Sequence, residues 1–511
     1  MAKGSKSRSR SESGASDLTL ASAEEQVAAL GRREVSSEEL TQAYLDRIHR
    51  FDGALNAIAS LDEEGARAAA RRCDEARESN RGALHGLPMT VKDGWEVAGI
   101  RSTAGIPALK DYVPAHDSQV VSRIRSAGAV ILGKTNIPTA NADFQTSNPV
   151  FGRTNNPWDL SRTPGGSCGG GAAAVASGMT GLELGSEIGG SLRLPAHFCG
   201  IYGHKSSAGI TPTTNHLPPG PGDPGQHLEP DLVVAGGMAR APGDLELLLR
   251  VIAGPSPDHA VAWRLDLPRP NAHSLGDFRI AVWFDDPFLA LDDEIRALLG
   301  QAAEALEAAG AKLDFGPALP ATLEESHRVY EALLFAAFST DRSTYSAKGT
   351  AYFIRSVLRH PRGQAMRTVK LIRQRHEQWL RQHMKRLELR ARWNKFFARY
   401  DAVLMPVTAS AAPPHHGKDH DRFGRTYTVN GQERNYFEQP IWSGVANLIG
   451  TPATAVPVGR TRSGLPVGVQ ILGPLYGDMT TIELARRIHE EVGGFVIPPG
   501  YEPAPPVAQV A

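Results

Sequence analysis

Cysteine is scarce in this sequence, which has three (Cys73, Cys168 and Cys199) among 511 residues. So few thiols exclude the disulfide framework that holds small secreted domains together. The same scarcity is typical of proteins kept in a reducing compartment. We therefore expect free thiols and a cytoplasmic location.

Net charge is absent as well, because 55 basic residues are balanced by 55 acidic ones. No overall field then favours nucleic acid or an acidic membrane surface. Long apolar runs are also missing: none approaches the roughly 18 residues of a membrane-spanning helix, and none of signal-peptide length follows the N-terminus. We expect a small neutral molecule as the partner, with no nucleic acid and no membrane span. A homodimer is a possible assembly.

The order of apolar and polar stretches predicts one large domain between two tails. Residues 1–18 are basic and serine-rich and are expected to be disordered, and residues 501–511 form a proline-rich tail. Between them, residues 19–500 begin with helical periodicity over residues 22–78 and continue with alternating helices and short apolar strands. This alternation is typical of the α/β class. We predict a central mixed, mostly open β-sheet covered by helices.

A helical insertion is predicted at about residues 322–400. Its second half, residues 365–400, carries many Arg and Lys residues beside Leu, Trp and Phe. A nucleic-acid or membrane helix would have this composition, but we favour one long amphipathic helix with a solvated basic face, since the charge is balanced elsewhere. Trp379 and Phe396 are candidates for an apolar substrate pocket, although aromatic residues at helical spacing are more often core.

The segment GAVILGKT at residues 128–135 has the spacing of a P-loop, so a P-loop-like nucleotide-binding protein is one alternative function. A phosphate cradle needs a turn between its glycines. Here residues 129–132 are expected to form a buried strand, and Pro138 prevents the helix that should follow. We therefore disfavour this alternative.

A second formal match is G-x-S-x-G at residues 165–169, the pattern of an α/β-hydrolase nucleophile elbow. That elbow requires a hydrophobic strand directly before it, whereas the preceding residues are polar and interrupted by proline. The candidate histidines for its triad have no convincing setting. They are His415, His416 and His489.

The strongest chemical signal is a Gly-rich run over residues 165–203. Two Gly-Gly-Ser units in it end at Ser167 and Ser191, separated by a small-residue helix and a short strand. Glycine permits close approach, so each hydroxyl can project from bare backbone. Four consecutive N–H groups can also converge as an oxyanion hole. They belong to Ile188, Gly189, Gly190 and Ser191.

This run resembles the signature of the amidase-signature family, in which GGSSGG, a small-residue helix and TDxGGSxRxPA follow one another. The segment GLPMTVKDGWEVAG at residues 86–99 resembles the family's GxPxxVKD. Later stretches, such as VANLIGTPATAVPVG and GLPVGVQILG, extend the likeness over most of residues 20–490. The resemblance implies Ser191 as nucleophile, Ser167 as proton relay and Lys92 as base.

Further features follow from the resemblance. It implies a cis peptide between Gly166 and Ser167, and it places Lys134 in a common LGKTN strand without the role of base. It implies no cofactor and no metal. The His-rich segment PPHHGKDHDRFG also lacks the ligand spacing of a zinc site, so we interpret it as a surface loop or pocket rim.

The sequence departs from the family pattern at two places. Cys168 stands where a second serine is usual, and Ser186-Glu187 stand where Thr-Asp is usual. We expect Cys168 to be a small packed side chain, because its neighbours are mostly glycines and no histidine is near in sequence. Glu187 is one methylene longer than Asp and is expected to pair with Arg193 in its own way.

The predicted function is hydrolysis of a C–N bond in a small hydrophobic amide through an acyl-enzyme, with carbamates (urethanes) and esters as further substrates. Phe144 is a candidate for the substrate pocket. The main alternative is a glutamine amidotransferase A-type subunit that supplies ammonia. The segment ADFQTSNPVFG resembles the MGSSTENSAFG of such subunits less than it resembles hydrolases of hydrophobic amides.

Overall fold

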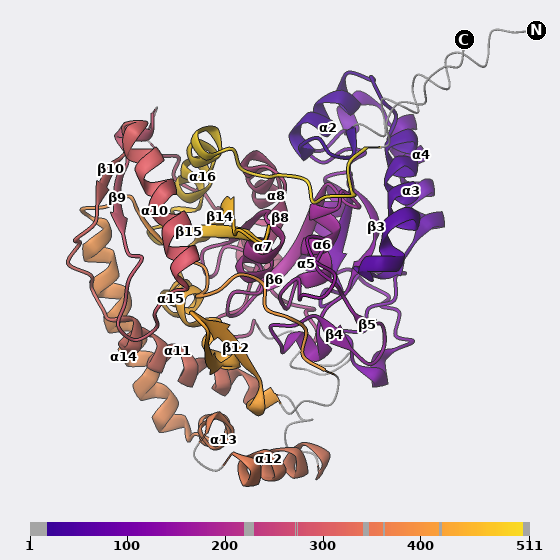
Figure 1. Ribbon diagram of the computed structural model, residues 1–511. Helices are drawn as coiled ribbons and strands as arrows, with labels where there is room; N and C mark the ends of the chain where they lie inside the picture. Colours follow the sequence, from indigo (N-terminus) through magenta and orange to yellow (C-terminus); the bar gives the residue numbers. More distant parts are fainter. Residues whose placement is uncertain are drawn as a thin grey trace, which may run out of the picture.

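One eleven-stranded sheet lies at the centre of the molecule (Figure 1). Its strands, in chain order, are β1 (Ile58–Leu61), β2 (Pro88–Lys92), β3 (Val130–Thr135), β6 (Leu182–Glu187), β7 (Tyr202–Lys205), β8 (Val234–Ala239), β9 (Arg279–Val282), β10 (Lys312–Asp314), β11 (Ala402–Pro406), β14 (Ala453–Arg460) and β15 (Pro466–Leu472). They lie side by side in the order β1-β3-β2-β6-β8-β7-β14-β15-β11-β9-β10. β2 is parallel to β3 and β6, and β9 is parallel to β10 and β11. The other neighbours are antiparallel, so the predicted mixed, open α/β sheet is confirmed.

The computed structural model describes residues 18–218, 229–270, 272, 274–340, 347–360, 363–417 and 422–503. The tails predicted at residues 1–18 and 501–511 fall outside these ranges except for Leu18 and residues 501–503. Among the described helices, none combines the length and the apolar character needed to cross a lipid bilayer.

Helices cover both faces of the sheet. One face carries α5 (Gln119–Ser126), α8 (Pro242–Ile252), α10 (Asp293–Ala308) and α16 (Asp478–Val492), and the other carries α3 (Ser37–Leu55), α4 (Glu63–Glu75), α6 (Gly169–Ala176) and α7 (Arg193–Cys199). The remaining helices of this body are α2 (Ala23–Gly31), α9 (Pro257–Ala260) and α15 (Ile441–Ile449). In Figure 1, α2, α3 and α4 lie at one end of the molecule and β9, β10 and α10 lie toward the opposite end.

Two small ribbons lie outside the main sheet. β4 (Ser147–Asn148) pairs with β5 (Gly152–Arg153), and β12 (Thr426–Val429) pairs with β13 (Gln432–Asn435). Both pairs are antiparallel and short, and Tyr427 and Val429 of β12 are buried in the main hydrophobic core.

Helix α6 lies directly against the backbone of the sheet. A Cβ atom added at Gly170 would come within 2.6 Å of the Ala57 carbonyl oxygen, and one added at Gly171 would come within 2.6 Å of the Glu183 carboxyl carbon. Real Cβ atoms do not approach other atoms so closely, so only glycine fits at these two positions. The contact fixes the N-terminus of α6, and with it the loop that carries Ser167.

The predicted helical insertion corresponds to four helices, α11 (Leu323–Ala337), α12 (Ala347–Arg359), α13 (Gln364–Ile372) and α14 (His376–Phe397). The prediction of one long helix over residues 365–400 is wrong, because the helix is broken at residues 373–375. The amide of Gln374 donates to the carbonyl oxygens of Leu371 (2.9 Å) and Ala332 (2.7 Å). The break is therefore tied to α11 by a hydrogen bond that the periodicity of the sequence does not reveal.

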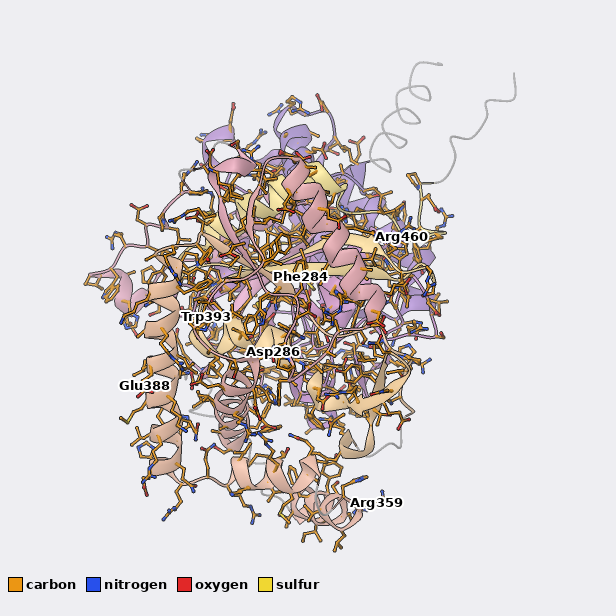
Figure 2. All side chains as sticks on the ribbon, turned by 60° about the vertical axis from the view of Figure 1, so that its left-hand side comes forward. Phe284, Asp286, Arg359, Glu388, Trp393 and Arg460 are labelled. Carbon is orange, nitrogen blue, oxygen red and sulfur yellow. The ribbon has the colours of Figure 1, made fainter. Side chains whose placement is uncertain are left out.

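Helix α14 is amphipathic, as expected. Trp393 is buried against Trp283, with ring centroids 6.3 Å apart, whereas Glu388 is exposed on the outer side of the same helix (Figure 2). Phe396 is buried among Trp393, Phe397 and Tyr400. Phe396 is thus a core residue and not part of a substrate pocket.

Candidate active site

The sheet brings the predicted residues to one edge. Lys92 is the last residue of β2, and Ser191 lies in the loop that follows β6. These strands are parallel neighbours, with Val91 opposite Leu184, so their carboxyl ends meet at the same edge. The loop that leads into α6 carries Ser167 to this edge from the covering layer.

The amine of Lys92 is buried and has three oxygen partners. Its Nζ lies 2.8 Å from Ser167 Oγ, 2.9 Å from Ser186 Oγ and 3.1 Å from the Ser186 carbonyl oxygen. The side chain is 1% exposed, so water does not solvate the amine. None of these three partners is a carboxylate.

The two serine loops are joined by their backbones. The peptide between Gly166 and Ser167 is cis, and the N–H of Cys168 donates to the Ser191 carbonyl oxygen at 3.2 Å. Ser167 and Ser191 are both buried, with exposures of 2% and 6%. The larger exposure belongs to Ser191, which lines a cavity described below.

The turn before Ser191 leaves its N–H groups uncommitted. Within the described residues, the N–H groups of residues 188–191 donate to no carbonyl or side-chain oxygen outside the strand ladder. Gly190 has a φ of +99°, a conformation that favours glycine. From the opposite side, the Tyr330 hydroxyl donates to the Ile188 carbonyl oxygen at 3.3 Å. The turn can therefore offer several N–H donors to one oxygen atom.

A buried ion pair holds this turn in place. The Glu187 carboxylate accepts from the Leu192 N–H at 3.0 Å and from Arg193 Nε at 3.1 Å. The Arg193 guanidinium also donates to the Ser443 carbonyl oxygen and to Asn447 Oδ1, each at 2.8 Å. Glu187 thus pairs with Arg193, and the longer side chain is accommodated because it also caps the backbone after Ser191.

Burial shifts the pKa values of the groups around Lys92. It lowers the pKa of the Lys92 amine, while the acidic groups of Cys168, Glu183 and Glu187 oppose this shift. Burial also raises the pKa of Glu183 to about 7, against hydrogen bonds from two threonine hydroxyls. It raises the pKa of the Cys168 thiol as well, and this thiol donates to the Ser186 carbonyl oxygen at 3.3 Å. Cys168 is a packed thiol, as expected, and not an activated thiolate.

Lys134 is equally buried but differs in its partners. Its Nζ lies 3.4 Å from the Asp93 carboxylate, 2.6 Å from the Trp95 carbonyl oxygen and 2.9 Å from Ser102 Oγ. The segment from which it projects is strand β3 and contains no phosphate-binding turn. The P-loop alternative is therefore wrong, for the predicted reason.

Sequence reasoning missed Ser186 as a partner of Lys92 and His216 as a partner of Ser186. Ser186 was singled out only as a departure, and His216 was not singled out at all. His216 Nε2 lies 2.8 Å from Ser186 Oγ, and its ring packs edge-on against Trp95. A single buried histidine in a loop leaves no pattern in the sequence, so only the fold reveals this contact.

A cavity of about 220 Å³ opens in front of Ser191. Phe144 lies in its lining together with Ile188 and Gly189, and Trp379 does not. Side chains of the helical insertion form one side, which we call the insert wall. It consists of Tyr330, Leu334, Phe335, Phe338, Tyr352, Phe353, Thr368 and Ile372.

The charged groups of this cavity are already paired with each other. Asp143 lies 2.8 Å from Arg425 and 3.5 Å from Arg422, and it accepts from the Tyr436 hydroxyl at 2.6 Å. The pKa of the Asp143 carboxyl is lowered because these partners outweigh its burial. The remaining lining is largely apolar and aromatic.

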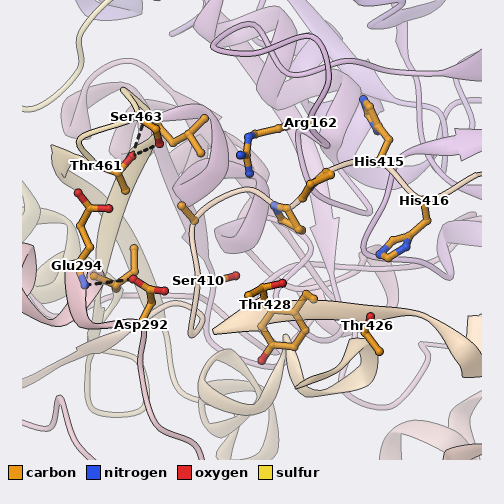
Figure 3. A pocket seen from close by; sticks show the side chains of 16 residues that line it. Arg162, Asp292, Glu294, Ser410, His415, His416, Thr426, Thr428, Thr461 and Ser463 are labelled. Carbon is orange, nitrogen blue, oxygen red and sulfur yellow. Dashed lines mark hydrogen bonds between the residues drawn. The ribbon is translucent and has the colours of Figure 1, made fainter. Parts of the chain in front are cut away.

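A second cavity, of about 400 Å³, shares no lining residue with the first (Figure 3). Its lining is mixed: Arg162, Ser410, His415 and His416 lie beside apolar residues such as Ile295 and Leu465. His489 lies elsewhere, bonded through Nδ1 to the Tyr202 hydroxyl at 2.6 Å. The three histidines considered for an elbow triad are therefore not next to Ser167. In the part of the chain that the structure covers, no group of three His, Cys, Asp or Glu side chains has the arrangement of a metal site.

Known proteins resemble the chain along most of its length. It is 31% identical to the A-type subunit of the glutamyl-tRNA(Gln) amidotransferase of Anaeromyxobacter sp. strain K, over 95% of this chain and 99% of that protein. The corresponding protein of Cutibacterium acnes is 32% identical over 93% of this chain and 96% of that protein. The crystal structure of the Thermotoga maritima counterpart superimposes with a TM-score of 0.75 at 25% identity, over 94% of this chain and 98% of that one.

Fold and relatives together define an enzyme that acts on amide C–N bonds. The chain belongs to the amidase family, whose model matches residues 39–482. Two specific functions were predicted, a free-standing amidase and an amidotransferase component. The names of these relatives favour the amidotransferase component.

Proposed function

We propose that this enzyme hydrolyses small amides with an apolar acyl group, through an acyl-enzyme formed on Ser191. Ser167 acts as proton relay and Lys92 as base. The observation that carries the proposal is the 2.8 Å contact between Lys92 Nζ and Ser167 Oγ, made by an amine whose three oxygen partners are all uncharged. Such a lysine can be neutral, and a base must be neutral to accept a proton.

The reaction begins with two linked proton transfers. Neutral Lys92 accepts the proton of Ser167, which accepts the proton of Ser191 as its oxygen attacks the carbonyl carbon. The negative charge on the former carbonyl oxygen is stabilised by the N–H groups of Ile188, Gly189, Gly190 and Ser191.

The same protons then return. The amide nitrogen is a poor leaving group until it is protonated, so the proton travels back through Ser167 and the C–N bond breaks. Water, deprotonated along the same path, attacks the acyl-enzyme and releases the acid from Ser191. Carbamates and esters form the same kind of acyl-enzyme and are further substrates of this route.

The cavity supports an apolar acyl group. Its insert wall and Phe144 present aromatic and aliphatic surface next to Ser191. Glutamine, in contrast, is a zwitterion that needs one cationic and one anionic group free to bind it. Asp143 is the carboxylate of the described lining, and Arg425 and Arg422 both engage it, so it is not free to bind the ammonium group of glutamine.

The second candidate is an amidotransferase component that releases ammonia from glutamine. The relatives from Anaeromyxobacter and Cutibacterium support it, because they carry that name and match nearly the whole chain. Such a component would work in a complex with other chains. A screen that measures ammonia from glutamine beside amine release from aryl amides, fatty amides and carbamates separates the two candidates. If glutamine were the only compound turned over, the proposal of an apolar substrate would be overturned.

Labelling with a fluorophosphonate tests the nucleophile. We expect one adduct, on Ser191, and no labelling or amide turnover in Ser191→Ala. Ser177→Ala is the matched control, because this buried hydroxyl donates to the Ala173 and Ala174 carbonyl oxygens at the end of α6, away from the reacting groups. An adduct on any other residue, with Ser191 unmodified in the active enzyme, would overturn the assignment.

The three free thiols support a cytoplasmic location for the enzyme.

A further inference from the structure

Ser186 and His216 form a buried pair behind the Lys92 amine. Ser186 Oγ lies 2.9 Å from Lys92 Nζ and 2.8 Å from His216 Nε2. The exposures of Ser186 and His216 are 2% and 7%, so water does not replace either contact. The chain from lysine to serine to histidine is continuous.

A neutral lysine can share hydrogen bonds with its three oxygen neighbours in few ways. A neutral amine has two N–H groups and one lone pair. The lone pair must face the Ser167 hydroxyl if Lys92 is to take its proton. Both N–H groups must then go to the other two neighbours, which are the carbonyl oxygen and the hydroxyl of Ser186.

Only one of these two acceptors is fixed by its chemistry. The Ser186 carbonyl oxygen cannot donate, so it always takes an N–H of Lys92. The Ser186 hydroxyl can accept, but it can also donate its own proton. If it donated to Lys92, it would occupy the lone pair and leave Ser167 without a base.

We propose that His216 is a positioning residue that removes this second possibility. Its Nε2 accepts the Ser186 hydroxyl proton, so Ser186 Oγ presents only lone pairs to Lys92, and the Lys92 lone pair is left for Ser167. The proposal rests on the proposed function, because it needs Lys92 as the base.

The surroundings of His216 keep its imidazole neutral, as the proposed acceptor role requires. Burial, with the nearby charges of Lys92 and Lys134, lowers the pKa of His216 to about 3, so the imidazole is neutral wherever the enzyme works. A neutral imidazole with its proton on Nδ1 has a lone pair on Nε2. The ring is fixed in place by Trp95, at a centroid distance of 4.6 Å.

The same arrangement also fits the protonated lysine. After proton transfer, Lys92 has three N–H groups and the same three oxygen neighbours, so each N–H keeps an acceptor. The Ser186 hydroxyl donates to His216 in both states. Proton transfer therefore needs no reorientation of this group, which lowers its cost.

The first test is His216→Phe, which keeps a ring against Trp95 and removes the acceptor. The freed Ser186 hydroxyl then donates to neutral Lys92. We expect kcat/KM for an amide to fall about ten-fold, the net worth of one hydrogen bond in a protein. We also expect the rising limb of the pH profile to move to lower pH, because a hydrogen bond to the neutral amine lowers the pKa of Lys92. His216→Gln, whose amide oxygen can accept, should recover most of the loss.

The decisive test is a double-mutant cycle with Ser186→Ala. Without the Ser186 hydroxyl there is nothing for His216 to orient, so adding His216→Phe to Ser186→Ala should change kcat/KM and the pH limb no further. Additive losses, or a fall in rate with an unmoved limb, would overturn the proposal and leave His216 a structural role. Thermal unfolding checks each variant. If His216→Phe does not fold, His216→Leu, which also lacks an acceptor, takes its place in the cycle.

Two further measurements separate this inference from the proposed function. His204→Gln is the matched control, since His204 is a buried histidine bonded to Thr454 and Asp478 and should leave the limb in place. Fluorophosphonate labelling of the wild type reports on Ser191 alone. If Ser191 is unlabelled, the proposed function and this inference both fail. If Ser191 is labelled and the cycle is additive, only the role of His216 is overturned.

Discussion

The floor and the wall of the cavity are built from different materials. We call Ser191, which lines the cavity, and the residues buried behind it the floor. These residues are Lys92, Ser167 and Ser186, and they lie at the ends of strands and in a Gly-rich loop. The insert wall comes from α11, α12, α13 and Phe338 directly after α11, and most of its side chains are apolar or aromatic. Floor contacts are directional hydrogen bonds of 2.8 to 3.1 Å around one amine, whereas wall contacts are non-directional packing.

This difference separates the two tasks of the enzyme. A directional network tolerates little change, because each donor and acceptor has one geometry that works. A packed apolar wall can change shape one side chain at a time, at a cost set by buried area. We therefore expect floor substitutions to change the rate of the chemical step and wall substitutions to change which amide is bound.

The largest expected effect is that of Lys92→Ala. Losing the base should lower kcat/KM on amides by about 10² to 10⁴-fold, the range typical of general acid–base groups. The loss of kcat/KM on esters should be smaller, because an alkoxide depends less than an amine on being protonated before it leaves. Steady-state kinetics on a matched amide and ester pair measure both numbers, and equal losses would contradict the role as base.

The pH profile sharpens the same prediction. In the proposed mechanism the neutral amine is the active form, so kcat/KM should rise as pH passes upward through the pKa of Lys92. Burial places this pKa below the usual value of about 10.4. The rising limb should be absent in Lys92→Ala. A limb that persisted there would mean that another group is the base.

Lys134→Met tests whether the rising pH limb belongs to Lys92 or to the other buried lysine nearby. It should lower activity less than Lys92→Ala does. The change leaves the buried Asp93 carboxylate without its cationic partner, which typically destabilises a protein by about 3 to 5 kcal/mol. We expect a lower Tm but an unmoved pH limb at temperatures where the variant is folded. If Lys134→Met erased the limb while Lys92→Ala kept it, the two lysines would exchange roles.

Phe353→Ala tests the wall. It removes aromatic surface from the cavity, so KM for a bulky aryl amide should rise about ten-fold while kcat for a short amide stays the same. Leu358→Ala is the control on the same helix, because Leu358 is 75% exposed and absent from the lining. An equal fall in kcat for both amides would break the division between floor and wall.

The smallest expected effect is that of a chelator. The proposed proton path uses only side chains of the floor, so EDTA should leave amide turnover unchanged. Activity lost with EDTA and restored by zinc would contradict that path. The measurement is a single rate comparison after dialysis.

The sequence allowed the strands and the Gly-rich loops of the floor to be predicted, because short apolar runs and Gly-Gly-Ser units are local patterns. The short strand expected between the two Gly-Gly-Ser units is β6, and the fold class is confirmed. β1 was missed, since its four residues are only partly buried and pair with a distant strand.

The partners of the floor could not be predicted in the same way. His216 and Tyr330 reach the site from segments that lie 30 and 142 positions from the residues they contact, so no spacing rule connects them. The insert wall is equally hidden, because aromatic residues at helical spacing look the same in a core and in a cavity. Trp379 illustrates this, since it stacks between His376 and His383 and does not line the cavity.

The close contact of α6 with the sheet has a consequence for the engineering of new substrates. Gly170 and Gly171 leave no room for a single added carbon, and the proposed relay Ser167 lies in the loop directly before the helix that they anchor. If this helix were randomised, most variants in the library would be unfolded or inactive. Libraries aimed at α12 and α13 instead would vary the shape presented to the acyl group, while every member inherits the same proton path.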